Sequence, residues 1–139
     1  MGQIRFEDDY MFRNNRMITS SPDIALTELV ANAWDAGALH VNIKLPIEND
    51  SIISVMDDGS GMSEEEFRER WMTLNYNRTK HQGKYVIFPD GVEENRTRVA
   101  YGRNGVGRHG MLCFADKYIV KTWKNGMCLE CTISTSSGD

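Results

Sequence analysis

The stretch SSPDIALTELVANAWDAG, residues 20–37, decides the fold because it specifies a helix with a stop at each end. Ser21 is in the position of an N-cap, and Pro22 lies in the first turn, where its missing N–H costs nothing. Gly37 suits a helix C-cap, because glycine adopts the left-handed conformation easily. The residues between these stops are predicted to form a single helix.

This helix has two chemically different faces. At about 100° per residue, one side is predicted to be an apolar stripe, and the opposite side carries Glu28, Asn32 and Asp35 at positions i, i+4 and i+7. The apolar stripe consists of Leu26, Leu29, Val30 and Ala33. The polar face has no Lys or Arg, and its short amide and carboxylate groups suit metal ions and water. The alternative interpretation is an ordinary solvated helix face.

The segments that follow alternate strands and helices. LHVNIKLPI (39–47) and SIISVMD (51–57) are predicted strands on either side of a turn at 48–50. Ser63 and Glu66 form a capping box, and EEEFRERWMTL (64–74) continues it as a helix. The last elements are a Gly-rich turn leading into a short helix (102–116) and a hairpin with strands at 116–123 and 127–134. This order is α/β in character.

A polar, irregular segment separates the two halves of the chain. It covers about residues 75–104 and contains Gly83, Pro89 and Gly91. At roughly thirty residues it is longer than ordinary connections, and long loops of this kind are often lids. We expect a lid-like loop here.

The run Asp57-Asp58-Gly59-Ser60-Gly61-Met62 ends the second predicted strand. Its glycines allow the backbone to approach a ligand closely, and a carboxylate can accept a hydrogen bond from a ligand amine. The alternative is a tight turn with solvated aspartates, because D-x-G-x-G is short and common.

The run from Gly102 to Gly110, GRNGVGRHG, is rich in glycines that free backbone N–H groups, and the following helix offers its positive end to an anion. A Rossmann site would require this run directly after a strand, and a P-loop would require Gly-Lys-Ser/Thr; neither condition is met. The run is therefore a phosphate cradle of another type, or else a flexible hinge.

Taken together, the order and spacing of these clusters resemble the GHKL ATPases, the superfamily of gyrase B, a heat-shock chaperone, histidine kinases and mismatch-repair MutL. The resemblance covers about residues 21–135, and the segment Asn77-Arg78-Thr79-Lys80 with the preceding Trp71 looks like the lid side of that family. The box E-x-x-x-N-x-x-D-A is matched by Glu28, Asn32, Asp35 and Ala36; D-x-G-x-G by Asp57, Gly59 and Gly61; and G-x-x-G-x-G by Gly102, Gly105 and Gly107.

The resemblance implies a fold and a domain organisation. The expected fold is α/β (α+β), a two-layer sandwich of a mixed, mostly antiparallel sheet with helices on one face, as in the Bergerat-type ATP-binding fold. Residues 1–139 would form a single ATP-binding domain. In the wider family a later strand supplies a Thr near adenine and a transducer domain follows; neither is recognisable here, so the resemblance implies a C-terminally truncated domain.

The resemblance also implies roles for individual residues. Asn32 would place a side-chain oxygen on Mg²⁺, and Glu28 would be the general base for the attacking water. Asp57 would accept a hydrogen bond from the adenine amine, which selects ATP over GTP, and Met62 would line the adenine pocket. Gly59 and Gly61 belong to the same adenine-side box. The expected phosphate-binding residues are Gly102, Gly105, Val106, Gly107, Arg108 and His109 in the Gly-rich run and Lys80 in the lid.

Arg108 departs from the apolar residue that often follows this box in the chaperone and gyrase branches. It makes the run more similar to microrchidia-like and stand-alone bacterial ATPases. For the side chains of Arg108 and His109, the alternative to phosphate contact is a solvated basic helix start.

Composition excludes several other classes of protein. No apolar run approaches the roughly 18 residues that span a bilayer, and the N-terminus does not resemble a secretory signal, so we expect a cytoplasmic protein with no membrane role. Three cysteines suit reduced thiols, and Cys128 and Cys131 should point to opposite faces of a strand. The charges are uneven: residues 1–67 carry 13 acidic and 4 basic side chains, and residues 68–139 carry 7 and 12.

The leading hypothesis is a Mg²⁺-dependent ATP hydrolase that drives conformational change or dimerisation in a longer, chaperone-like protein. A nucleotide-binding switch with negligible turnover is a second hypothesis. A histidine-kinase-like phosphotransfer domain is more distant, because His40, His81 and His109 are not in a phosphoacceptor helix. A nucleic-acid module would use the basic second half, and the client or partner is not predicted.

Overall fold

The computed structural model describes residues 21–47, 52–73, 77–101 and 107–134. The predicted phosphate-binding residues Gly102, Gly105 and Val106, and the predicted turn at 48–50, lie outside these residues. The elements in chain order are α2 (Pro22–Asp35), β1 (Val41–Lys44), β2 (Ser54–Asp57), α3 (Glu64–Glu66), the π-helical turn η2 (Phe67–Trp71), α4 (Arg78–Gln82), the 3₁₀ helix η3 (Gly107–Cys113), β3 (Lys117–Lys124) and β4 (Met127–Ser134). No described helix is long and apolar enough to cross a membrane.

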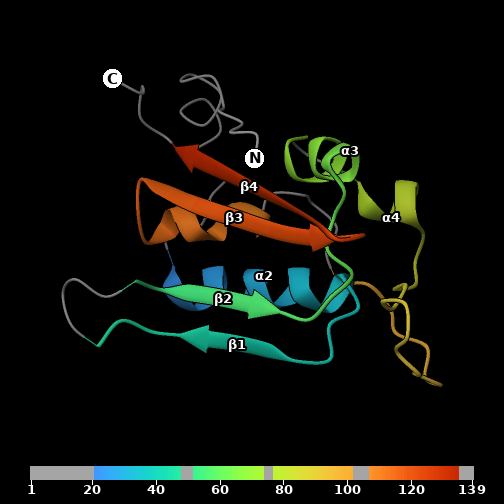
Figure 1. Ribbon diagram of the computed structural model, residues 1–139. Helices are drawn as coiled ribbons and strands as arrows, with labels where there is room; N and C mark the ends of the chain where they lie inside the picture. Colours follow the sequence, from blue (N-terminus) through green and yellow to red (C-terminus); the bar gives the residue numbers. More distant parts are fainter. Residues whose placement is uncertain (1–20, 48–51, 74–76, 102–106, 135–139) are drawn as a thin grey trace.

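The architecture confirms the α+β expectation, with helices packed against antiparallel strands. β1 pairs with β2, and β3 pairs with β4, both antiparallel. In Figure 1 the strands form a front layer with α2 behind them, and β2 and β3 both point toward the end where α3 and α4 lie. The last residues of β2 and β3 therefore meet the helical segments at one end of the molecule.

Helix α2 has the predicted stops. Ser21 is extended at the N-cap position, although its side chain makes no capping hydrogen bond, and Pro22 opens the helix. Gly37 has φ +76°, and a Cβ atom there would lie 2.7 Å from the carbonyl oxygen of Ile87. Glycine is needed at this position for two reasons, the left-handed turn and the close approach of the 84–101 segment.

The buried face of α2 differs from the predicted stripe. Leu29 and Ala33 are buried as expected, but Val30 is exposed and Ala25 is completely buried. The reason is the position of η3, whose Gly110 packs so closely that a Cβ there would lie 3.0 Å from the Ala25 carbonyl oxygen. The contact between α2 and η3 is therefore made by small residues, Ala25 and Gly110, which allow the two helices to pack closely.

The β3–β4 hairpin supplies most of the core. Its turn has Asn125 at φ 52° and Gly126 at φ 76°, the left-handed pair that two-residue hairpin turns require. The buried cluster consists of Phe67, Tyr118, Cys131 and Ile133. Cys131 is buried while Cys128, on the other face, is only half-buried, as the strand alternation predicts, and none of the three cysteines forms a disulfide within the described residues.

The helix predicted after Ser63 is present but changes type. The capping box between Ser63 and Glu66 is complete, with both hydrogen bonds formed. From Phe67 onward the chain makes a π-helical turn, closed by the Met72 N–H donating to the Phe67 carbonyl at 3.1 Å. The rings of Phe67 and Trp71 stack with their centroids 6.2 Å apart; Phe67 belongs to the core cluster, and Trp71 packs against it.

The segment expected to be irregular is partly ordered against α2. It contains helix α4 and a β-bridge between Tyr85 and Val99. The Arg98 guanidinium lies 4.1 Å from the Trp34 ring centroid and donates to the Ala38 carbonyl at 2.8 Å. Arg98 thereby fastens residues 84–101 to the C-terminal end of α2, where a cation is favourable.

Candidate functional site

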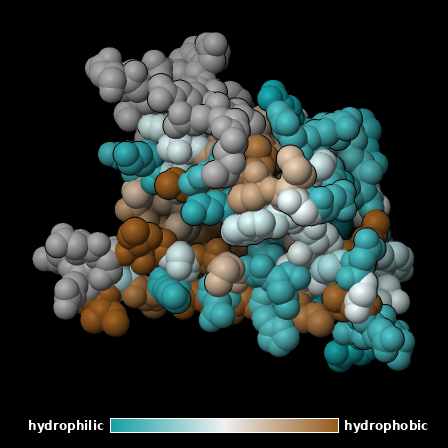
Figure 2. All heavy atoms as spheres, in the orientation of Figure 1, coloured by the Kyte–Doolittle hydropathy of each residue, from teal (hydrophilic) through white to brown (hydrophobic). Residues whose placement is uncertain are grey.

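One large cavity brings the sequence motifs together. Its volume is about 2440 Å³, more than the ~300–1,000 Å³ of ordinary ligand pockets, and its lining includes residues all along β2 and β3. The sequence-predicted residues that line it are Glu28, Asn32, Asp35, Asp57, Gly59, Gly61, Met62, Gly107 and Arg108. The described parts of all three motifs therefore line one cavity. Figure 2 shows one face of the molecule, on which hydrophilic side chains gather near α3.

The polar face of α2 forms one wall of this cavity. Glu28, Asn32 and Asp35 are each half-buried rather than solvated. The Asn32 side-chain nitrogen is buried and has no hydrogen-bond partner among the described residues. A buried amide of this kind is costly unless a ligand or water completes its hydrogen bonds. Asp35 is held differently, since its carboxylate accepts from the Tyr101 N–H at 2.6 Å.

The D-x-G-x-G motif docks directly on the end of α2. Ser60 N–H donates to the Ala36 carbonyl at 2.8 Å, and a Cβ at Gly59 would lie 2.7 Å from the Ala36 Cβ. Asp57 Oδ1 accepts from the Gly59 N–H at 2.8 Å. This bond fixes one oxygen of the carboxylate, and Asp57 lines the cavity.

Asp58, the neighbour of Asp57, has a structural role that the sequence did not reveal. Its Oδ1 accepts from the N–H groups of Leu39 and His40, each at 2.8 Å, and its Oδ2 lies 2.9 Å from His40 Nδ1. The hydrogen bonds from His40, followed by that from Leu39, lower the pKa of Asp58 to about 2. Asp58 ties the start of the β1 hairpin to the end of β2.

Thr122 on β3 is a second residue that sequence reasoning missed. It is buried, lines the cavity, and accepts a hydrogen bond from the Met62 N–H at 2.8 Å. Gly61, with φ +66°, lets this loop approach β3 so closely that a Cβ would overlap the Trp123 carbonyl oxygen. The alternation of β3 could have indicated that Thr122 faces inward with Tyr118 and Val120.

The described part of the Gly-rich motif lies against α2. Gly107 packs on Glu28 with no room for a Cβ. The Arg108 guanidinium donates to the carbonyl oxygens of Trp71, at 2.7 Å, and Thr73. Arg108 is only 6% exposed, so it is not part of a solvated basic surface, and its side chain is occupied by protein carbonyls.

His109 points into the core and does not line the cavity. It is 1% exposed, and its Nδ1 lies 2.7 Å from the Tyr118 hydroxyl. Burial, with a smaller effect of the Arg108 charge, lowers the pKa of His109 to about 3. The imidazole is therefore neutral near pH 7.

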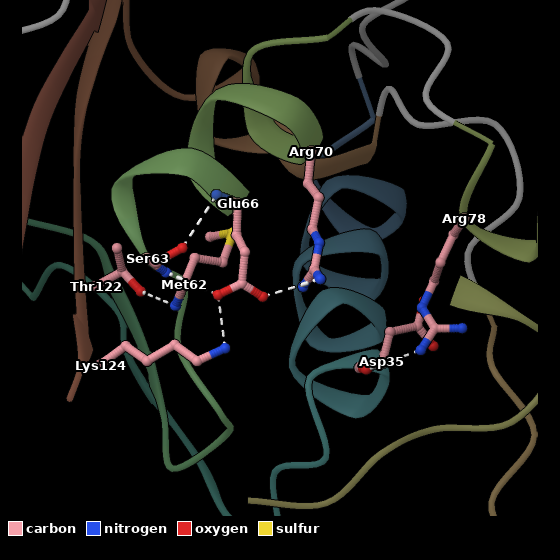
Figure 3. Close-up of polar contacts among 8 residues, drawn as sticks. All are labelled: Asp35, Met62, Ser63, Glu66, Arg70, Arg78, Thr122 and Lys124. Atoms are coloured by element: carbon pink, nitrogen blue, oxygen red, sulfur yellow. Dashed lines mark hydrogen bonds and ion pairs between the residues drawn. The ribbon is translucent and has the colours of Figure 1, made fainter. Parts of the chain in front are cut away.

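The lid side of the cavity is basic, but not through Lys80. Lys80 is exposed and is absent from the cavity wall, which Arg70 and Arg78 line instead. Glu66 lies between two cations, 2.6 Å from Lys124 Nζ and 2.9 Å from an Arg70 nitrogen (Figure 3). Partial burial of Glu66 opposes ionisation, but the Lys124 and Ser63 hydrogen bonds prevail and lower its pKa to about 2.

The donor set suits a cation that arrives with an anionic ligand. The described residues contain no group of three or more His, Cys, Asp or Glu side chains that could hold a metal ion alone. Mg²⁺ commonly takes one or two protein oxygens and completes its shell with water and substrate phosphates. Asn32 could offer its side-chain oxygen to such an ion, with Glu28 one turn earlier, while its buried and unpaired side-chain nitrogen could donate to a phosphate oxygen or to water.

Comparison with known proteins agrees with these motifs. Residues 19–137 match the family model described as "Histidine kinase-, DNA gyrase B-, and HSP90-like ATPase". The DNA mismatch repair protein MutL of Paramagnetospirillum magneticum is 45% identical over 49 residues, which are 35% of this chain and 8% of MutL. MutL of Phocaeicola vulgatus is 43% identical over 51 residues, 37% of this chain and 8% of that protein. The matched part is thus a small fraction of these much longer relatives.

Proposed function

This chain belongs to the family of histidine kinase-, DNA gyrase B- and HSP90-like ATPases, and from that membership we propose that it binds and hydrolyses ATP with Mg²⁺ in the cavity beside α2. The observation that carries the proposal is the convergence of the motifs. Gly59 and Ser60 dock on Ala36, and Gly107 docks on Glu28, so the boxes meet on one helix.

Adenine is the proposed ligand of the D-x-G-x-G side. The second carboxylate oxygen of Asp57 would accept from the exocyclic amine, whereas guanine would present a carbonyl there and be repelled. Met62 and Thr122 form the adjoining wall, and their mutual hydrogen bond fixes its position.

The triphosphate is proposed to lie between α2 and the Gly-rich motif. Backbone N–H groups of the motif would bind the phosphate oxygens. Asn32 would hold the Mg²⁺ that accompanies the nucleotide, and that ion would neutralise phosphate charge. Gly107 brings the motif close enough to Glu28 for both to contact one ligand.

Glu28 is the proposed general base. Its carboxylate makes no hydrogen bond or ion pair within the described ranges, although it is half-buried on the cavity wall. A carboxylate in that position can accept a proton from a water molecule that attacks the terminal phosphate. Hydrolysis would then drive conformational change or dimerisation in a longer protein. The match of part of this chain to a small part of MutL is compatible with that role.

Calorimetry with ATP and ADP, with and without Mg²⁺, tests binding, and phosphate release by the Glu28→Ala variant tests the base. We expect ATP binding strengthened by Mg²⁺, and a Glu28→Ala variant that binds ATP but turns over at least about 100-fold more slowly. Equal loss of binding and turnover would remove Glu28 from the base role. ATP binding with no measurable turnover in the wild-type chain would instead identify a nucleotide-binding switch.

A further inference from the structure

Arg70 occupies a position that neither the motifs nor the proposed catalytic roles use. It lies on the π-helical turn η2 and lines the cavity. Glu66 holds one side of its guanidinium at 2.9 Å. In the amide orientation that satisfies both partners, the Gln82 side-chain oxygen accepts from Arg70 Nη1 at 2.9 Å and from Nε at 3.0 Å. Arg70 therefore connects η2 to helix α4.

The position of Arg70 points to the phosphate end of the cavity. The next residue, Trp71, accepts a hydrogen bond from the Arg108 side chain at 2.7 Å, which places η2 beside the start of η3. On the other side, Arg78 of α4 donates to the carbonyl of Asp35 at the end of α2 (Figure 3). Arg70 of η2 and Arg78 of α4 therefore both line the cavity.

The partners of Arg70 are unequal in strength. Glu66 is itself fixed by Lys124 and by the Ser63 N–H, so it is a rigid support for the guanidinium. Gln82 is a neutral amide, and a guanidinium binds a phosphate oxygen more strongly than an amide oxygen because the acceptor is charged. A phosphate that reached Arg70 would displace Gln82 and leave Glu66 in place.

We propose that Arg70 binds a phosphate group of the nucleotide by exchanging its Gln82 partner, so that nucleotide binding releases α4 from η2. The inference rests on the proposed ATP-binding function. It adds a lid-side phosphate contact and a physical link between the nucleotide and the segment that carries α4.

The test compares the binding of ATP, ADP and adenosine to the wild-type chain and to Arg70→Ala, by calorimetry. Arg70→Ala is expected to weaken ATP and ADP binding about tenfold or more while adenosine binding is unchanged, since one charge-assisted hydrogen bond to phosphate is lost. Arg68→Ala is the matched control, because Arg68 also pairs with a glutamate four residues earlier, Glu64 at 3.0 Å, but lies outside the cavity wall. It should bind all three ligands like the wild type.

The Gln82→Ala variant tests whether a phosphate displaces Gln82 from Arg70 or whether the contact between Gln82 and Arg70 only supports the structure. If phosphate displaces Gln82, removing that competitor should tighten ATP binding several-fold, whereas a structural contact would weaken it when lost. Unaltered or weaker ATP binding by Gln82→Ala would overturn the inference. Equal losses of adenosine and ATP binding in Arg70→Ala would overturn it as well. Neither result would affect the proposed function as long as the wild-type chain binds ATP. A wild-type chain that binds no nucleotide would overturn the proposed function and this inference with it.

Discussion

Gly107 lies so close to Glu28 that a Cβ at position 107 would come within 2.9 Å of both Cβ and Cδ of the glutamate and would overlap its Oε2. The only side chain that fits at 107 is therefore a hydrogen atom. This contact links the first and third motifs at the point where we propose that water attacks phosphate.

Replacing Gly107 with Ala should displace Glu28 and reduce turnover more than ATP affinity. A shift of about 1 Å in a catalytic group can cost about 100-fold in rate. Steady-state phosphate release and calorimetry would measure the two effects. Gly110→Ala is the control, because it disturbs the same α2–η3 contact at Ala25, away from Glu28. Equal effects of the two variants on turnover would contradict a specific contact with Glu28.

The Asp57→Asn variant should bind ATP about 10–100-fold more weakly, because one carboxylate oxygen already serves the Gly59 N–H. An asparagine has a single side-chain oxygen, so its nitrogen would face the adenine amine and repel it. Calorimetry with ATP and GTP checks this prediction. Unchanged ATP affinity would remove Asp57 from the adenine site.

The buried His109 should make the protein less stable as pH falls. Its pKa is lowered from 6.5 to about 3 in the folded state, so between these values the unfolded chain binds more protons than the folded one. Stability is present above about pH 6.5 and is lost as pH falls toward 3, by at most about 1.4 kcal/mol per pH unit.

Urea unfolding at pH 7, 6 and 5 measures this slope. It should flatten in His109→Gln but persist in His81→Gln, because His81 is exposed. A wild-type slope unchanged in both variants would contradict the assignment to His109.

Removing the Arg98 side chain should release residues 84–101 from α2. Loss of the Trp34 ring contact and the bond to the Ala38 carbonyl is expected to cost about 2 kcal/mol. Hydrogen exchange should show faster exchange of the Val86 and Ala100 amides, which are bonded across the bridge. Arg96→Ala is the control, since Arg96 is 89% exposed; similar exchange in both variants would rule out the Arg98 clamp.

Much of the fold could be predicted from local pattern. The stops of α2, the capping box of Ser63 and the hairpin turn at Asn125 and Gly126 were all readable, because each depends on a few neighbouring residues. The exposure of Val30 and the complete burial of Ala25 could not be predicted from the sequence. They depend on where η3 packs, and helical periodicity alone does not contain that information.

The grouping of the motif residues around one cavity was predictable, because it follows from their spacing along the chain. Glu28, Asn32 and Asp57 do face one cavity. Arg108 and His109 illustrate the limit, because their side chains turn to the Trp71 carbonyl and the Tyr118 hydroxyl, partners 37 and 9 residues away. Thr122, Arg70 and the ion pair of Glu66 with Lys124 were missed for the same reason, since these roles arise from contacts between separate elements.

The π-helical turn at Phe67–Trp71 determines in which directions its own side chains point. A π turn carries one residue more than an α turn, so the positions after it are rotated by about 100° relative to a regular helix. Phe67 and Trp71 reach the core from this turn while Arg70, between them, reaches the cavity. Deleting one residue here would restore an ordinary helix and turn Arg70 away from the cavity, so the spacing between the second and third motifs is constrained by a helix irregularity as well as by loop length.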